Sequence, residues 1–200
     1  YCASGSTIDF MLAMERTFNE IEVSTIIHMI LKGLELIHSK KLIHRDIKGA
    51  NILLSEDGYA KLADFGVGVI LKEEKYRKSN KGSPYWMSPQ IAAGQKYATK
   101  TDIWSLGITC LELIKGEPPF CDMEPKDIIS KIAKDPPKIS EILEINEHSE
   151  DFVDFVGKCL EVNPIKRPNA SKLLKHPFII KYSQGRKFLK HLIRINLNAV

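Results

Sequence analysis

Apolar side chains recur every three or four positions along residues 20–39, a spacing that predicts a long helix with a broad apolar face. The side chains of this face are Val23, Ile26, Ile27, Ile30, Leu34 and Ile37. Residues 99–115 are apolar on nearly every side, which indicates a second helix buried at the centre of the domain. Trp104 lies in this segment and is expected to be a core residue. Further helices are expected at 125–134, 149–160 and 169–175.

Between residues 42 and 63 the pattern changes to short pieces that favour β-structure. They are residues 42–43, 51–54 and 59–62, with the turn sequence Glu56-Asp57-Gly58 between the last two. The polar, lysine-rich stretch 72–81 has no apolar period, which predicts a mobile loop. The pattern as a whole predicts one mainly helical domain with short β-hairpins, and functional loops in its first half.

The composition is that of an ordinary globular domain. The chain has 200 residues, of which 44% are hydrophobic and 27% charged, and its formal net charge is +4. This balance indicates no nucleic acid and no membrane as a partner. The 200 residues contain no run of about 18 apolar residues and no basic-then-apolar leader, so the expected location is cytoplasmic. The four cysteines lack the paired spacing of a zinc site, and reduced, partly buried thiols are expected.

Two motifs in fixed order carry the chemistry. The first is His44-Arg45-Asp46-Ile47-Lys48-Gly49-Ala50-Asn51, and the second, thirteen residues after its Asn, is Asp64-Phe65-Gly66. They fit the protein-kinase patterns H-R-D-x-K-x-x-N and D-F-G. Either triplet alone would be a weak signal, but their order and spacing together are highly specific.

Phosphoryl transfer explains why these residue types occur together. The reaction needs a positioned acceptor hydroxyl and neutralised phosphate charge, with little covalent work for the protein. Asp46 is expected to accept or orient the proton of the substrate hydroxyl. Asn51 and Asp64 offer oxygen ligands for Mg²⁺, held between the protein and the phosphates of ATP. Lys48 can reach the γ-phosphate as a point charge.

The chain resembles a sterile-20-family kinase, in particular the mammalian sterile-20-like, or Hippo-type, group, over all 200 residues. The matching segments outside the two motifs are Tyr1-Cys2, Gly5-Ser6, Gly82-Ser83-Pro84-Tyr85-Trp86-Met87, Asp102-Ile103-Trp104-Ser105-Leu106-Gly107, Glu117-Pro118-Pro119-Phe120, Asn163-Pro164, Arg167-Pro168, His176-Pro177-Phe178-Ile179, Phe188-Leu189 and Leu192-Ile193. The resemblance implies a protein-kinase-like C-terminal lobe, with a kinase domain from the hinge over 1–180. It also implies a basic, helical extension over 181–200. In this family a lysine at the position of Lys48 marks Ser/Thr acceptors.

The resemblance also implies an adenine site. Tyr1 and Cys2 resemble the hinge, where the Cys2 backbone N–H would bond adenine, and an ordinary apolar residue is the alternative for Cys2. Leu53 resembles the apolar floor of the adenine pocket, and Ser6 is placed near the ribose.

Structural support of the catalytic loop, residues 44–51, is implied for a further set of residues. Asp102, inside an apolar helix, would be a costly buried charge, but in the family it accepts backbone N–H bonds from the His44-Arg45 turn. Phe65 and Gly66 belong to the same support.

Regulatory roles are implied for Arg45, Ser79 and Ser83. Arg45 resembles the arginine that pairs with a phosphate on the activation loop, and Ser79 aligns with the activating phosphosite of the group. A solvated serine is the alternative for Ser79. Ser83 stands where the family has a threonine that bridges Asp46 and Lys48.

The sequence departs from the family at two points. Gln90 replaces the glutamate that pairs with the arginine matching Arg167, so a charge-assisted pair becomes a neutral hydrogen bond. The 200 residues also contain no Gly-rich phosphate loop, strand lysine or helix glutamate, so the N-terminal β-lobe is expected to be absent from this chain.

Two functions remain open at this stage. The leading hypothesis is the catalytic lobe of an ATP- and Mg²⁺-dependent kinase that phosphorylates Ser or Thr of protein substrates, with little activity expected from these residues alone. The alternative is a catalytically inactive kinase remnant that binds proteins. A small-molecule phosphotransferase would not explain the docking segment 82–90 or the residue type at Lys48.

Overall fold

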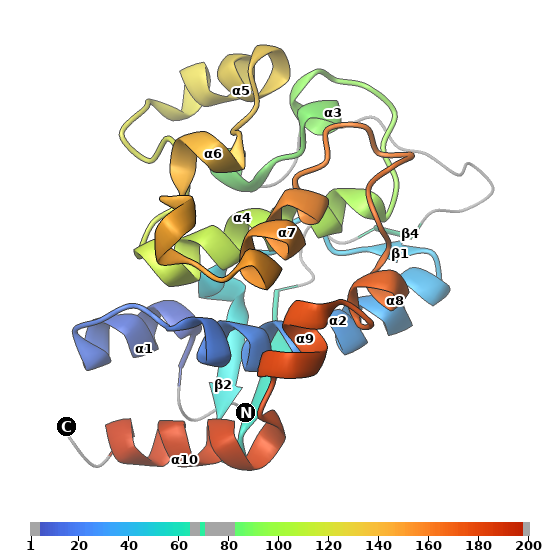
Figure 1. The fold of residues 1–200 in the computed structure, drawn as a ribbon. Coiled ribbons are helices and arrows are strands. Elements are labelled where there is room, and N and C mark those ends of the chain that lie inside the picture. The colour runs from blue at the N-terminus through green and yellow to red at the C-terminus, as the bar shows by residue number, and fades with distance from the viewer. Residues whose placement is uncertain (1–4, 65–68, 71–82, 198–200) are drawn as a thin grey trace.

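Two long helices form the core of the fold. The computed structural model describes residues 5–64, 69–70 and 83–197 (Figure 1). Helix α2 (Glu20–Ser39) begins with Asn19 as N-cap, whose side chain accepts a hydrogen bond from the Glu22 backbone while the Glu22 carboxylate bonds the Asn19 backbone. Helix α4 (Lys100–Lys115) ends at Gly116, which is left-handed at φ 93°. The bounds of both helices agree with the predicted ranges, 20–39 and 99–115, to within one residue.

The C-terminal helices pack on these two and close the core. Helix α7 (Glu150–Cys159) lies against α4, whereas α8 (Ala170–Leu173) and α9 (Pro177–Tyr182) lie against α2. Trp104, in α4, is fully buried, as predicted. Helix α8 is shorter than the predicted 169–175, because Asn169 is its N-cap rather than its first helical residue and Leu174 is already its C-cap.

A smaller layer surrounds the segment that follows Ser83. It consists of α3 (Pro89–Ala92), α5 (Pro125–Lys134) and α6 (Ile139–Ile142), at the top of Figure 1. Helix α5 was predicted, whereas α3 and α6 are single turns too short to show a period. A second, small apolar cluster lies here and consists of Ile43, Met87, Ile91 and Tyr97.

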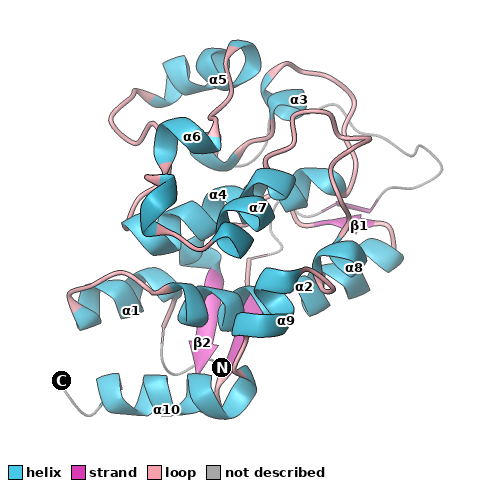
Figure 2. Ribbon diagram, in the orientation of Figure 1, coloured by secondary structure: helices cyan, strands magenta, loops and turns pink. Residues whose placement is uncertain are grey.

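Among the described residues, the strands form two antiparallel pairs (Figure 2). Strands β2 (Ile52–Ser55) and β3 (Tyr59–Leu62) form the predicted hairpin around the turn at 56–58. Strand β1 (Leu42–Ile43) pairs with β4 (Val69–Ile70), a contact between distant segments that the local pattern did not show. Asn51 lies at the end of a 3-10 turn and not in the strand predicted for 51–54.

Besides α2, which packs against β3, two further helices contact the hairpin. Helix α1 (Thr7–Met14) was not predicted, although Ser6 and Asp9 form a capping box that is visible as a sequence signature. Helix α10 (Gly185–Leu197) lies in the segment expected to be a helical extension. In the described part of the chain, no helix is long and apolar enough to cross a membrane.

Candidate active site

A buried carboxylate holds the start of the catalytic loop. Asp102 is fully buried in α4, and its Oδ2 accepts the His44 N–H at 2.9 Å while its Oδ1 accepts the Arg45 N–H at 2.9 Å. His38 Nε2 lies 2.7 Å from Oδ2. Arg45 has φ 71°, a left-handed conformation that strains any residue with a side chain. Asp102 thus accepts the hydrogen bonds of both backbone amides in this unusual turn.

Asp46 lies at the centre of a polar network. Asn51 Nδ2 donates to Asp46 Oδ2 at 2.8 Å, and Ser83 Oγ donates to Asp46 Oδ1 at 2.8 Å. Lys48 Nζ lies 3.2 Å from Asp46 Oδ2 and donates to Ser83 Oγ at 2.7 Å. The structure therefore brings together all four residues and places Ser83 between Asp46 and Lys48.

The network also determines the charge state of Asp46. Burial by itself would raise the pKa of this carboxyl group. The hydrogen bond from Ser83, the charge of Lys48 and the bonds from Lys48 and Asn51 outweigh burial and lower the pKa below its ordinary value. Asp46 is consequently an ionised hydrogen-bond acceptor at neutral pH.

Two side chains whose oxygen atoms could bind a metal ion lie at the open end of the β2–β3 hairpin. Asn51 directly precedes β2, and Asp64 follows β3 by two residues. The Ala63 N–H donates to the Asn51 carbonyl at 2.9 Å, so the two segments are joined there. Asp64 is exposed and, like Arg45, has a left-handed conformation, at φ 58°.

This donor set fits Mg²⁺ bound together with nucleotide phosphates. Asn51 Nδ2 donates to both the backbone and the side chain of Asp46, which leaves the amide Oδ1 as its acceptor atom. The part of the chain that the structure describes has no cluster of three or more metal-ligating side chains. Mg²⁺ is commonly held by one or two carboxylates plus substrate phosphates. Asn51 and Asp64 could therefore supply the protein ligands of such a site.

Glu112 is a site residue that the sequence reasoning missed. Its Oε2 accepts the Gly49 N–H at 2.8 Å and the Trp86 Nε1–H at 3.0 Å, so it joins the catalytic loop to the segment after Ser83. Burial raises the pKa of Glu112, against the lowering effect of these two bonds and of the charge of Lys48. The available signal was an acidic residue, the second in α4 after Asp102, within an otherwise apolar stretch.

The residues expected near adenine and ribose lie next to the hairpin. Leu53 is partly exposed, on the opposite face of β2 from the buried Ile52 and Leu54. Ser6 forms a bridge with Leu53, but its Oγ donates to Asp9 Oδ2 at 2.8 Å and its N–H to the same oxygen at 2.7 Å. The Ser6 hydroxyl is thus already used to cap α1. The contact of Ser6 with ribose stays a prediction.

Several of the expected site residues lie outside the described residues. They are Tyr1, Cys2, Phe65, Gly66, Ser79 and the lysine-rich stretch 72–81. Of the regulatory set, Arg45 and Ser83 are described, and Arg45 Nη1 donates to the Tyr97 hydroxyl at 3.4 Å. Tyr97 precedes α4, so Arg45 connects the catalytic loop to that region.

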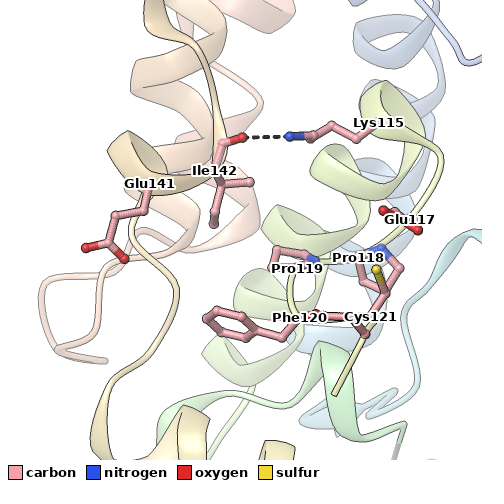
Figure 3. A pocket seen from close by; sticks show the side chains of 9 residues that line it. Lys115, Glu117, Pro118, Pro119, Phe120, Cys121, Glu141 and Ile142 are labelled. Atoms are coloured by element: carbon pink, nitrogen blue, oxygen red, sulfur yellow. Dashed lines mark hydrogen bonds between the residues drawn. The ribbon is translucent and has the colours of Figure 1, made fainter. Parts of the chain in front are cut away.

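A separate hollow lies beyond the end of α4 (Figure 3). It measures about 320 Å³, and Lys115 donates across it to the Ile142 carbonyl at 2.9 Å. A hydrogen bond to Glu117, burial, and the charges of Glu117 and Asp122 raise the pKa of the exposed Cys121 thiol. A raised pKa keeps the thiol protonated at neutral pH, and a protonated thiol is a poor nucleophile.

Gln90 and Arg167 form a hydrogen bond in place of an ion pair, as expected from the sequence. Arg167 is 1% exposed and Gln90 is 8% exposed. Arg167 Nη2 donates to Gln90 Oε1 at 3.1 Å, and Gln90 Nε2 donates to the Val162 carbonyl at 2.7 Å. Burial lowers the pKa of Arg167 to about 10, and no carboxylate within the described ranges lies in ion-pair contact with it.

Gln90→Glu is expected to raise the melting temperature. The new carboxylate gives Arg167 a charge-assisted partner, which outweighs the lost bond to the Val162 carbonyl by about 1 kcal/mol. For a domain of this size the gain corresponds to about 2–4 °C in a thermal unfolding experiment. Gln90→Leu, which removes both bonds, is the matched control and should lower the melting temperature. An unchanged or lower value for Gln90→Glu would show that the bond to Val162 dominates.

Comparison with known proteins agrees with this geometry. The family described as "Protein kinase domain" matches residues 1–179, so the chain belongs to the protein kinase family. It is 43% identical over 193 residues to the serine/threonine-protein kinase dst3 of Dictyostelium discoideum. The alignment covers 96% of this chain and 34% of dst3, so the chain spans about a third of the length of that relative. The mainly helical fold is that of the C-terminal portion of a Ser/Thr kinase.

Proposed function

We propose that the protein to which residues 1–200 belong transfers the γ-phosphoryl group of ATP to Ser or Thr side chains of other proteins. The observation that carries this proposal is the network in which Ser83, Lys48 and Asn51 surround the Asp46 carboxylate. The similarity to dst3 and the sequence resemblance support a kinase of the sterile-20-like group. That the whole protein acts on protein substrates is part of the same proposal.

Asp46 receives the proton of the substrate's Ser or Thr hydroxyl group. All four lone-pair sites of its carboxylate are in use, through contacts with the Ser83 hydroxyl, the Ser83 N–H, Asn51 and Lys48. The Lys48 contact is long, at 3.2 Å. When Lys48 turns to the γ-phosphate, a site on Asp46 Oδ2 becomes available for the substrate hydroxyl. The hydroxyl oxygen then bonds phosphorus, its proton passes to Asp46 and the bond to the ADP oxygen breaks.

Asn51 and Asp64 are the residues that would hold Mg²⁺. When bound, the ion neutralises charge on the phosphate oxygens and orients the transferred group. The chain contributes the placement of the two donors at adjacent ends of β2 and β3. Leu53, next to them on β2, supplies apolar surface for the base.

The test uses the full-length protein with Mg²⁺ and radiolabelled ATP. Degenerate peptides that carry a single Ser, Thr or Tyr serve as acceptors. Label is expected on Ser and Thr and not on Tyr, and EDTA is expected to abolish it. Residues 1–200 alone should transfer little, because they contain no G-x-G-x-x-G sequence for the phosphates. Absence of label with the full-length protein would favour the inactive binding module instead.

A further inference from the structure

Helix α10 packs on the closed end of the β2–β3 hairpin, away from the polar network. Figure 1 shows it crossing below β2, and it also contacts α1 and α2. Leu189 and Ile193 are fully buried on its inner face, whereas Lys187 and Arg194 are exposed. The helix is therefore a firmly docked part of the fold.

The hairpin turn accepts α10 only because residue 58 is glycine. Gly58 is buried and has φ 81°. A Cβ atom there would lie 2.4 Å from the Arg186 carbonyl oxygen and 2.7 Å from the Lys190 backbone nitrogen. Contacts this short with backbone atoms would push the helix away.

Polar contacts add to this docking. Arg186 Nε donates to the Asp57 carbonyl at 2.7 Å, and its guanidinium lies 4.4 Å from the centre of the Tyr59 ring. Arg186 and Lys190 each lie 3.6 Å from Asp57 Oδ1. Because Asp57 is largely exposed, the ion pairs contribute little by themselves, and the buried apolar face and the tight turn dominate.

The hairpin connects this contact to the two proposed metal ligands. Its closed end is held by α10, and its open end carries Asn51 and Asp64, joined by the bond from the Ala63 N–H to the Asn51 carbonyl. Each strand has four residues, so the two ends are about 13 Å apart. An isolated two-stranded hairpin is only marginally stable in water, so its geometry depends on what packs against it.

We propose that α10 is a positioning element for Asn51 and Asp64, acting through the β2–β3 hairpin. Docked α10 holds the closed end, and the paired strands transmit this restraint to the open end. Loss of docking weakens Mg²⁺ and nucleotide binding before it affects the transfer step. The expected effect on Mg²⁺ and nucleotide binding rests on the proposed function. The coupling between α10 and the open end of the hairpin does not depend on activity.

The test compares Gly58→Ala with Gly94→Ala in the full-length protein. Both glycines are left-handed, at φ 81° and φ 63°, so both substitutions introduce similar backbone strain. The added Cβ meets α10 only at Gly58, because nothing lies within 4 Å of the corresponding position at Gly94. Leu189→Ala, with the exposed Lys187→Ala as control, provides a second pair in case Gly58→Ala fails to fold.

Two readouts are needed. Hydrogen exchange follows the Ala63 amide at the open end, which lies about one strand length from Gly58 at the closed end. Fluorescent mant-ADP binding is titrated with Mg²⁺ at fixed protein concentration. We expect Gly58→Ala and Leu189→Ala to speed Ala63 exchange and to raise the half-saturating Mg²⁺ concentration about fivefold or more. The two controls should change neither.

A purely structural role for α10 gives a different result. Faster exchange confined to α10 and the turn, with an unchanged Ala63 amide and Mg²⁺ titration, would overturn the proposal. If the wild-type protein bound no mant-ADP, the proposed function would fail, and Ala63 exchange alone would decide whether α10 controls the open end of the hairpin.

Discussion

Replacing Asp46 with Asn is expected to lower kcat by about 10²–10⁴-fold, because an amide oxygen is a far weaker proton acceptor than a carboxylate. The amide also presents an NH₂ group to Asn51 Nδ2 or to Lys48 Nζ, both of which are donors. The network that now holds Asp46 would therefore lose one contact as well as its charge. The measurement is steady-state phosphorylation of the preferred Ser or Thr peptide by the full-length protein.

The exposed residue Asp127, in α5, provides the matched control for this change. Asp127→Asn makes the same chemical change outside the network and should leave kcat within about twofold, as for most surface substitutions. A kcat for Asp46→Asn within tenfold of the wild type would contradict the assignment of Asp46 as proton acceptor. Unchanged peptide KM alongside the lower kcat would locate the loss in the transfer step.

Asp102→Ala is expected to destabilise the domain by about 3 kcal/mol or more. The change leaves the His44 and Arg45 amides and the His38 ring without their acceptor in a fully buried place. At about 2–4 °C per kcal/mol, the melting temperature should fall by about 10 °C. Thermal unfolding followed by circular dichroism measures this shift.

Two companion variants make the Asp102 result specific. Asp102→Asn keeps one acceptor oxygen and should lose less stability than Asp102→Ala. Asp122→Ala removes an exposed carboxylate and should shift the melting temperature by no more than about 2 °C. Equal effects of Asp102→Ala and Asp122→Ala would show that the two buried amides find other acceptors.

The sequence predicted the fold where a regular period is long. Helices α2 and α4 were correct because burial repeats over four or more turns, and the β2–β3 hairpin followed from strand residues on both sides of Glu56-Asp57-Gly58. Strand β4 was missed because two residues carry no period and pair with a partner some 27 positions away in the chain. Helices α3 and α6 are single turns, which tertiary packing determines.

The candidate site was predictable in its residue types but not in its contacts. Kinase motifs placed Asp46, Asn51 and Asp64 together, and the resemblance placed Ser83 beside Lys48. The role of Glu112 was not visible, because one acidic residue in an apolar helix does not indicate which amides it meets. Gly58 looked like a simple turn residue, and its approach to Arg186 involves residues more than 120 positions apart.

The left-handed conformations of Arg45 and Asp64 have a consequence for the evolution of the chain. Each costs about 1–3 kcal/mol relative to a relaxed backbone, and glycine would relieve most of that strain. Selection for thermal stability alone would therefore favour glycine at both positions. The proposed function instead uses a guanidinium and a carboxylate there, so under that proposal the fold carries a standing loss of stability at two positions of the site.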